Sequence, residues 1–79
     1  MTPETVDVVI TDFLKEISRR LDEAVSIAKA AEACADAGNP KQAVDIAMDV
    51  EPLVFDVNTL LNGATLLQHS FKPDNRDCT

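Results

Sequence analysis

Few side chains in this 79-residue sequence could carry chemistry, and their spacing brings no reactive set together. His69 is the only histidine, and no carboxylate lies within three residues of it. Acid–base or nucleophilic catalysis needs several converging titratable groups. The two cysteines, Cys34 and Cys78, form no Cys-x-x-Cys pair and no cluster of ligands. We therefore predict no catalytic residue, no enzyme activity and no small-molecule substrate.

The placement of the cysteines indicates a reducing compartment. Cys34 stands among alanines, which favours a small buried thiol, and Cys78 lies in the polar segment 72–79, which favours an exposed one. The N-terminus has no basic segment followed by an apolar run, so we expect no secretory signal. No apolar run approaches the roughly 18 residues of a membrane span. These features predict a cytoplasmic protein that does not bind membranes.

Four carboxylates gather in the second half of the chain, at Asp45, Asp49, Glu51 and Asp56. A calcium-binding loop needs oxygen ligands that alternate around a glycine, and this segment contains no such loop. We therefore predict no metal and no cofactor. These acids are expected to form a solvated surface or a surface that faces a partner.

The net charge of −7 is unevenly distributed. Residues 22–71 hold two lysines against eight acids, which gives −6 for this part of the chain. Such a field repels phosphate backbones, so we expect no direct binding to nucleic acid. It also speeds the encounter with a basic protein surface, although solubility alone accounts for much acidic surface.

A long helix must position most of these side chains. Residues 4–37 contain neither glycine nor proline, and Thr2-Pro3-Glu4 is typical of a helix start. The segment 37–40, Ala-Gly-Asn-Pro, then combines a left-handed helix end at Gly38 with the start of another helix. Apolar residues three and four apart predict one buried stripe on the first helix. The stripe comprises Val6, Val9, Ile10, Phe13, Leu14, Ile17, Leu21, Ala24, Val25, Ala28, Ala31 and Ala35.

This helix carries residues of opposite charge at positions four apart. Glu16 with Arg20, and Arg19 with Glu23, predict ion pairs on its outer side. The continuity of the stripe also allows a short break in the helix within 18–22. A long helix predicted in so short a chain needs a second arm, a second copy or another protein to cover its stripe.

The return arm is expected to be kinked. Pro52 should break it, because proline lacks an N–H and clashes with the preceding turn. We predict three helices, at 3–37, 40–51 and 53–71, in an all-α antiparallel hairpin. We expect one helical domain over 1–71, a disordered tail over 72–79, and a core completed by a second copy as a helical-bundle homodimer.

The third predicted helix carries apolar residues on two sides. Opposite its main stripe, Phe55, Thr59, Asn62 and Leu66 repeat at spacings of four, three and four. Three interpretations are open: the segment 40–51 covers this second seam, a second chain binds it, or it is merely exposed. We interpret Phe55 and Leu66 as partner-binding anchors, flanked by Thr59 and Asn62. The expected charged surround consists of Asp45, Asp49 and Asp56.

The stretch from Ala24 to Phe71, AVSIAKAAEACADAGNPKQAVDIAMDVEPLVFDVNTLLNGATLLQHSF, resembles the small quorum-sensing antiactivators of rhizobia, the QseM-like proteins. The resemblance covers about two-thirds of the chain and rests on length, acidity and the order of helices. It implies a protein that binds LuxR-type transcriptional activators and prevents promoter activation, including at promoters that control the transfer of a mobile genetic element.

Two functions follow from these observations. The first is a non-catalytic regulator that sequesters a LuxR-type activator by protein–protein contact. The second is a helical assembly module whose main activity is to pair with itself and which has no regulator partner.

Overall fold

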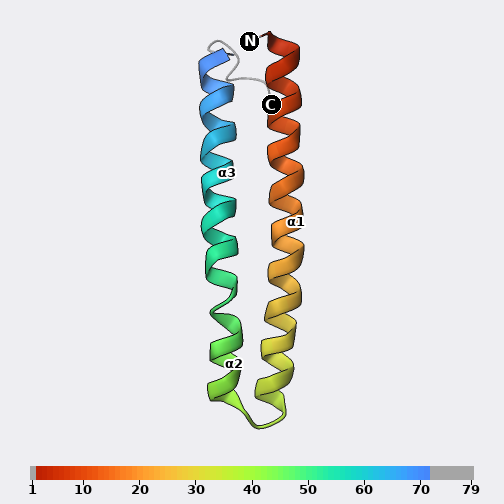
Figure 1. Ribbon diagram of the computed structural model, residues 1–79, viewed down its shortest axis with the longest axis vertical. Coiled ribbons are helices and arrows are strands. Elements are labelled where there is room, and N and C mark those ends of the chain that lie inside the picture. Colours follow the sequence, from red (N-terminus) through yellow and green to blue (C-terminus); the bar gives the residue numbers. More distant parts are fainter. Residues whose placement is uncertain (1, 72–79) are drawn as a thin grey trace.

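The computed structural model describes residues 2–71 and contains three helices within that range. Helix α1 spans Pro3–Asp36, α2 spans Pro40–Ala47 and α3 spans Val50–Phe71. The chain turns back after α1, and α2 and α3 run antiparallel to it in one line (Figure 1). The result is a rod with extents of 54 × 20 × 18 Å. It confirms the predicted all-α hairpin with a long first helix and a bent return arm.

The two ends of α1 follow the sequence signals. The Thr2 hydroxyl oxygen accepts a hydrogen bond from the Thr5 amide at 3.1 Å, which caps the first turn. At the other end, Gly38 has a φ of +98°, a left-handed conformation that glycine adopts without a steric penalty. The amide of Asn39 donates to the Cys34 carbonyl and that of Gly38 donates to the Ala35 carbonyl. This pattern is a Schellman motif, so it both ends α1 and reverses the chain.

Helix α1 is continuous, so the break considered at 18–22 does not occur. The return arm was expected to break at Pro52, but it is interrupted four and three residues earlier, at Met48 and Asp49. Pro52 lies in the first turn of α3, where a missing N–H removes no intrahelical bond. Its ring would clash with the Met48 carbonyl in a continuous helix, and that carbonyl instead accepts from the Glu51 amide at 3.1 Å. Pro52 therefore accounts for the break upstream of itself.

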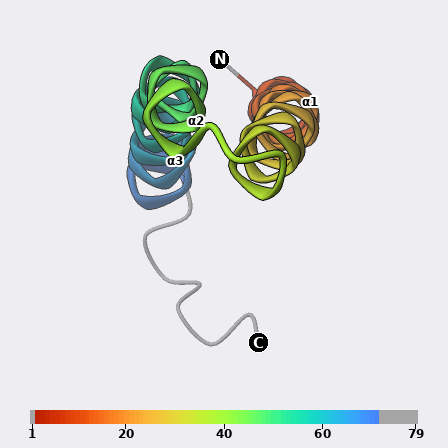
Figure 2. The same cartoon turned by 90° about the horizontal axis from the view of Figure 1, so that it is seen from below.

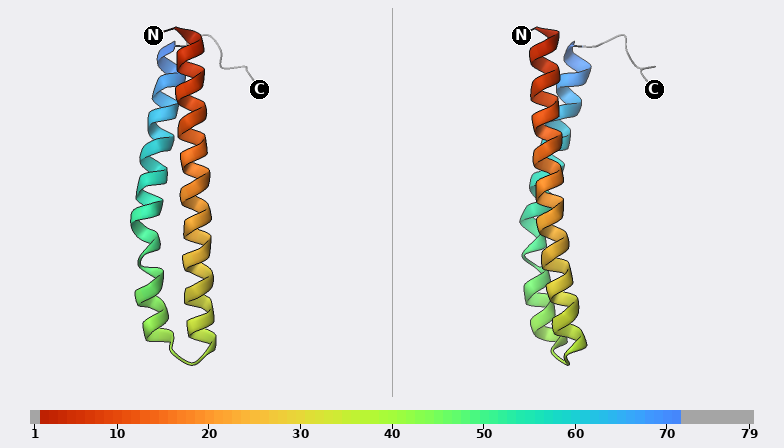
Figure 3. Two further views of the ribbon diagram at one scale, coloured as in Figure 1. Left: turned by 45° about the vertical axis from the view of Figure 1, so that its right-hand side comes forward. Right: turned by 90° about the vertical axis from the view of Figure 1, so that its right-hand side faces the viewer.

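The two arms share a seven-residue repeat. Seen from the end of the rod, they form two columns, and they stay side by side along their length (Figures 2 and 3). Positions that alternate by three and four are buried or half-buried, as in an antiparallel coiled coil. On α1 they are Val6, Ile10, Phe13, Ile17, Arg20, Ala24, Ile27, Ala31 and Cys34. On the return arm they are Ala43, Ile46, Val50, Leu53, Val57, Leu60, Ala64 and Leu67.

Two contacts define how the arms align. A Cβ added at Gly63 would lie 3.0 Å from the Phe13 ring, and Arg20 binds Asp56 at 2.8 Å. Arg20 follows Phe13 by seven residues on α1, and Asp56 precedes Gly63 by seven residues on α3, so the two contacts share one antiparallel register. The absence of a side chain at Gly63 makes room for the ring, which is a close approach that favours glycine.

The seam is narrower than the stripe predicted from sequence. Leu14, Leu21 and Val25 belong to the predicted stripe, yet their exposed fractions are 52%, 45% and 51%. Ala28 and Ala35 are exposed too, whereas Arg20 occupies a seam position. A single partner helix covers about two positions in every seven, so the outer part of a wide stripe stays uncovered.

Candidate protein-binding surface

The described part of the chain contains no cluster of metal-ligating side chains. Among residues 2–71, no three His, Cys, Asp or Glu side chains are close enough to hold a metal ion. None of the described helices is long and apolar enough to cross a membrane. Cys34 is half-buried, and its thiol donates to the Asn39 carbonyl at 3.5 Å, while Cys78 lies outside the described residues. The tail predicted over 72–79 lies outside them as well.

The second seam predicted on the third helix is uncovered in the monomer. We call Phe55, Thr59, Asn62 and Leu66 the outer seam, and all four are exposed. Phe55 and Leu66 have exposed fractions of 69% and 67%, the highest among the exposed large apolar residues of the described chain. The Thr59 hydroxyl donates to the Phe55 carbonyl at 3.0 Å, so it is already engaged within the helix. Helix α2 continues the line of α3 (Figure 1) and packs against α1, so it does not cover this seam.

The three predicted acids differ in their surroundings. Asp45 and Asp49 are exposed, whereas Asp56 is half-buried and accepts a hydrogen bond from Arg20 at 2.8 Å between Oδ2 and Nη1. Asp45, Thr59 and Leu66 are spaced by multiples of seven residues, and so are Asp49 and Asp56, which places them on one flank of the return arm. Asp45 and Asp49 precede Phe55 along this arm, and Asp45 lies about 30 Å from Leu66 along the arm axis. Asp56 binds Arg20 and so links the two arms.

Arg20 links the arms from within the seam. Its Nε lies 2.9 Å from Glu16 Oε2, which confirms the predicted pair with Glu16, but the N–H is not aligned for a hydrogen bond. The prediction that this pair lies on the outer side of α1 was wrong for Arg20, which is half-buried. Its aliphatic stem can fill an apolar position while the guanidinium reaches two carboxylates.

The same cluster perturbs the pKa of Glu16. Arg19 donates hydrogen bonds to Glu16, and this is the main cause that holds the pKa of the Glu16 carboxyl below its ordinary value of 4.5. Partial loss of hydration acts in the opposite direction, and the charges of Arg19 and Arg20 lower the pKa further. The same contact raises the pKa of Arg19. One flank of the hairpin is therefore charged and internally paired.

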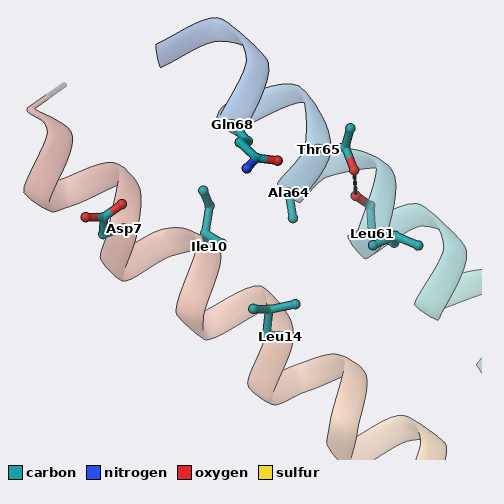
Figure 4. Close-up of a pocket in the computed structure, with 7 residues that line it drawn as sticks. All are labelled: Asp7, Ile10, Leu14, Leu61, Ala64, Thr65 and Gln68. Carbon is teal, nitrogen blue, oxygen red and sulfur yellow. Dashed lines mark hydrogen bonds between the residues drawn. The ribbon is translucent and has the colours of Figure 1, made fainter. Parts of the chain in front are cut away.

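The opposite flank carries a surface of half-exposed apolar side chains, and three of them, Leu14, Leu21 and Val25, belong to the stripe that was predicted to be buried. We call Leu14, Leu21, Val25, Val54 and Leu61 the apolar face, and these side chains are 45% to 52% exposed. Leu14 and Leu61 line one open pocket of about 340 Å³ between α1 and α3 (Figure 4). The spacing of seven between Leu14 and Leu21, and between Val54 and Leu61, keeps each pair on the same flank. Seam positions also recur after seven residues, so this spacing does not by itself separate the apolar face from the seam.

The pocket is lined by four apolar and three polar side chains. Ile10 and Ala64 form its floor with Leu14 and Leu61, and Asp7 and Gln68 stand at one end (Figure 4). The Thr65 hydroxyl donates to the Leu61 carbonyl at 2.9 Å, so it too is engaged within the helix. The pocket suits an apolar side chain of another polypeptide better than a polar small molecule.

The fold and these surfaces define an elongated helical hairpin with two uncovered apolar regions. Comparisons with protein-family models, with curated proteins and with solved structures found no match to the chain.

Proposed function

We propose that this chain is a non-catalytic antiactivator, a cytoplasmic regulator that sequesters a LuxR-type transcriptional activator and prevents promoter activation. The exposure of Phe55 and Leu66 carries the proposal. Large apolar side chains exposed on a helix side that no part of the monomer covers are typical of protein-binding sites. The resemblance of residues 24–71 to rhizobial antiactivators supports the choice of partner.

Charge supports the same partner class. A LuxR-type activator binds DNA through a helix-turn-helix domain, and DNA-binding surfaces are basic. Residues 22–71 of this chain carry −6, and Asp45 and Asp49 are exposed on the return arm, on the N-terminal side of the outer seam. Opposite charges accelerate the encounter, while the apolar anchors slow dissociation. On this proposal, Asp45 and Asp49 steer the activator and the outer seam holds it.

A pull-down against a LuxR-type regulator tests the proposal, with wild type beside Phe55→Ala and Leu66→Ala. Val8→Ala is the matched control, because Val8 is 59% exposed but lies on α1. We expect wild type and Val8→Ala to bind, and both outer-seam variants to bind at least tenfold more weakly. Binding that is equal in all four proteins would remove Phe55 and Leu66 as anchors. No binding by wild type would remove the partner class.

The second candidate is a self-associating helical module with no regulator partner. The uncovered apolar face is the observation that favours it. A protein of this kind would sediment as an oligomer and would fail to retain any LuxR-type regulator. A monomer at low micromolar concentration would exclude this candidate. The two functions are compatible, because a dimer can also bind a regulator.

A further inference from the structure

We propose that the apolar face is the docking site for a second copy of this chain, and that the resulting four-helix bundle leaves the outer seam free. The proposal does not depend on the regulator. It starts from the fact that a single hairpin has two columns of helix and one seam between them (Figure 2). The apolar face stands beside that seam on one flank, so two hairpins laid flank to flank would join their seams into one core.

The distribution of charge selects the occupant. On the flank of the apolar face, α1 holds Thr11, Leu14, Ser18, Leu21, Val25 and Ala28 at the outward positions of the repeat. The α3 positions on that flank are Glu51, Val54, Asn58, Leu61, Thr65 and Gln68. Glu51 is the one charged residue in these two sets, in a chain where 27% of residues are charged.

A basic partner would find only Glu51 to pair with over these turns. A second copy also carries −7, so it can approach closely only through a surface that carries little charge. The nearest acids on this flank of α1, Asp7 and Glu32, stand at the two ends of the uncharged stretch. Charge therefore favours self-docking here, and it favours a basic partner on the opposite flank.

The size of the flank also fits a dimer. The rod measures 54 × 20 × 18 Å, so one flat side has a projected area of about 1,000 Å². A standard stable interface buries about 800 Å² on each partner. The Cα radius of gyration is 17.4 Å, against about 12 Å for a compact domain of this length. Lateral pairing would bring the particle closer to a normal compact shape.

The repeat makes a second copy a geometrically matched partner. The apolar face repeats every seven residues, at Leu14 and Leu21 on α1 and at Val54 and Leu61 on α3. Side chains at this spacing pack as knobs into holes that a partner must offer at the same spacing. A second hairpin supplies holes at that interval over the whole length of the rod. The contact is isologous, because each copy offers the same patch to the other.

Sedimentation of the full chain, from low to high micromolar concentration, tests this arrangement. The variants are Leu21→Glu and Leu61→Glu on the apolar face, with Phe55→Glu as the matched control on the outer seam. We expect wild type and Phe55→Glu to be dimers. Leu21→Glu and Leu61→Glu should self-associate at least about a hundredfold more weakly, because each substitution enters an isologous contact twice. Far-UV circular dichroism checks the helix content, and Leu61→Ala replaces any glutamate variant that unfolds.

Salt gives an independent reading. Added salt screens the repulsion between two acidic copies, so the dimer should persist or tighten, whereas binding of a basic partner should weaken. Monomeric wild type over the whole concentration range would overturn the proposal. So would a loss of dimer in Phe55→Glu as large as that in Leu61→Glu. Failure of the pull-down with a regulator would leave self-docking unaffected.

Discussion

The contact between Phe13 and Gly63 allows a quantitative test of how the arms pack. A Cβ added at Gly63 would lie 3.0 Å from Cε2 of the ring, and 3.7 and 3.8 Å from Cδ2 and Cζ. Carbon atoms in favourable contact are about 3.5–4.0 Å apart, so only the first distance is too short. Gly63→Ala therefore requires the ring or α3 to move by a few tenths of an ångström.

Two opposing contributions set the size of the effect. Replacing glycine by alanine inside a helix stabilises it by about 1 kcal/mol. Overpacking a core contact costs about 1–3 kcal/mol. With about 2 kcal/mol for the contact, Gly63→Ala should lower the free energy of unfolding by about 1 kcal/mol. In a Phe13→Leu background the Cε2 and Cζ atoms are absent, so the same substitution should raise it by about 1 kcal/mol.

Urea unfolding followed by far-UV circular dichroism measures these changes in the four proteins of the cycle. All samples need one fixed concentration, because self-association would add a concentration-dependent stability. Asn62→Ala is the control, since Asn62 is exposed beside Gly63 and should have the same effect in both backgrounds. If Gly63→Ala changes the free energy of unfolding equally in the wild-type and Phe13→Leu backgrounds, the packing argument is refuted.

Three further outcomes test the capping, the core and the charged flank. Leu53→Ala, at a residue only 9% exposed, should lower the free energy of unfolding by about 2–3 kcal/mol, and a loss within about 0.5 kcal/mol would contradict its place in the core. Gly38→Ala should cost about 1 kcal/mol although no atom lies within 4 Å of the added Cβ, because φ is +98° there; unchanged stability would contradict the left-handed cap. The folded-state pKa of Glu16 is lowered, so its ionised carboxyl stabilises the folded state above pH 4.5. This stabilisation is lost as the pH falls through the folded-state pKa. Arg19→Gln should raise that pKa in an NMR titration, and an unchanged titration would show that Arg19 is not the cause.

The sequence was sufficient to predict the hairpin, because its signals are local. Residues 4–37 lack helix breakers, Thr2 caps the start, and Gly38 has the one conformation that reverses the chain there. Propensity and capping act within a few residues, so they can be evaluated without knowing what packs against the helix. The exposure of Phe55 and Leu66 could also be predicted, because they lie opposite the stripe of their own helix.

The division of the apolar residues between core and surface could not be predicted in the same way. Leu14 and Leu21 belong to the same broad stripe as Phe13, and only the position of the partner arm decides which of them is covered. Arg20 was expected outside, since charge at an apolar position is costly unless it is paired. Its partner Asp56 lies 36 residues away, so the pairing depends on the tertiary register.

That register has a consequence for the order in which the hairpin forms. At the turn, Cys34 and Asn39 meet after five residues of chain, whereas Phe13 and Gly63 are fifty positions apart. Closing the longer loop costs about 2 kcal/mol more in chain entropy. The turn end is lined by small side chains such as Ala31 and Ala43, and the open end holds Phe13 and Leu60. We expect contacts between the arms to form first near the turn, where loop closure costs least. Most of the buried area should form last, near the start of α1 and the end of α3.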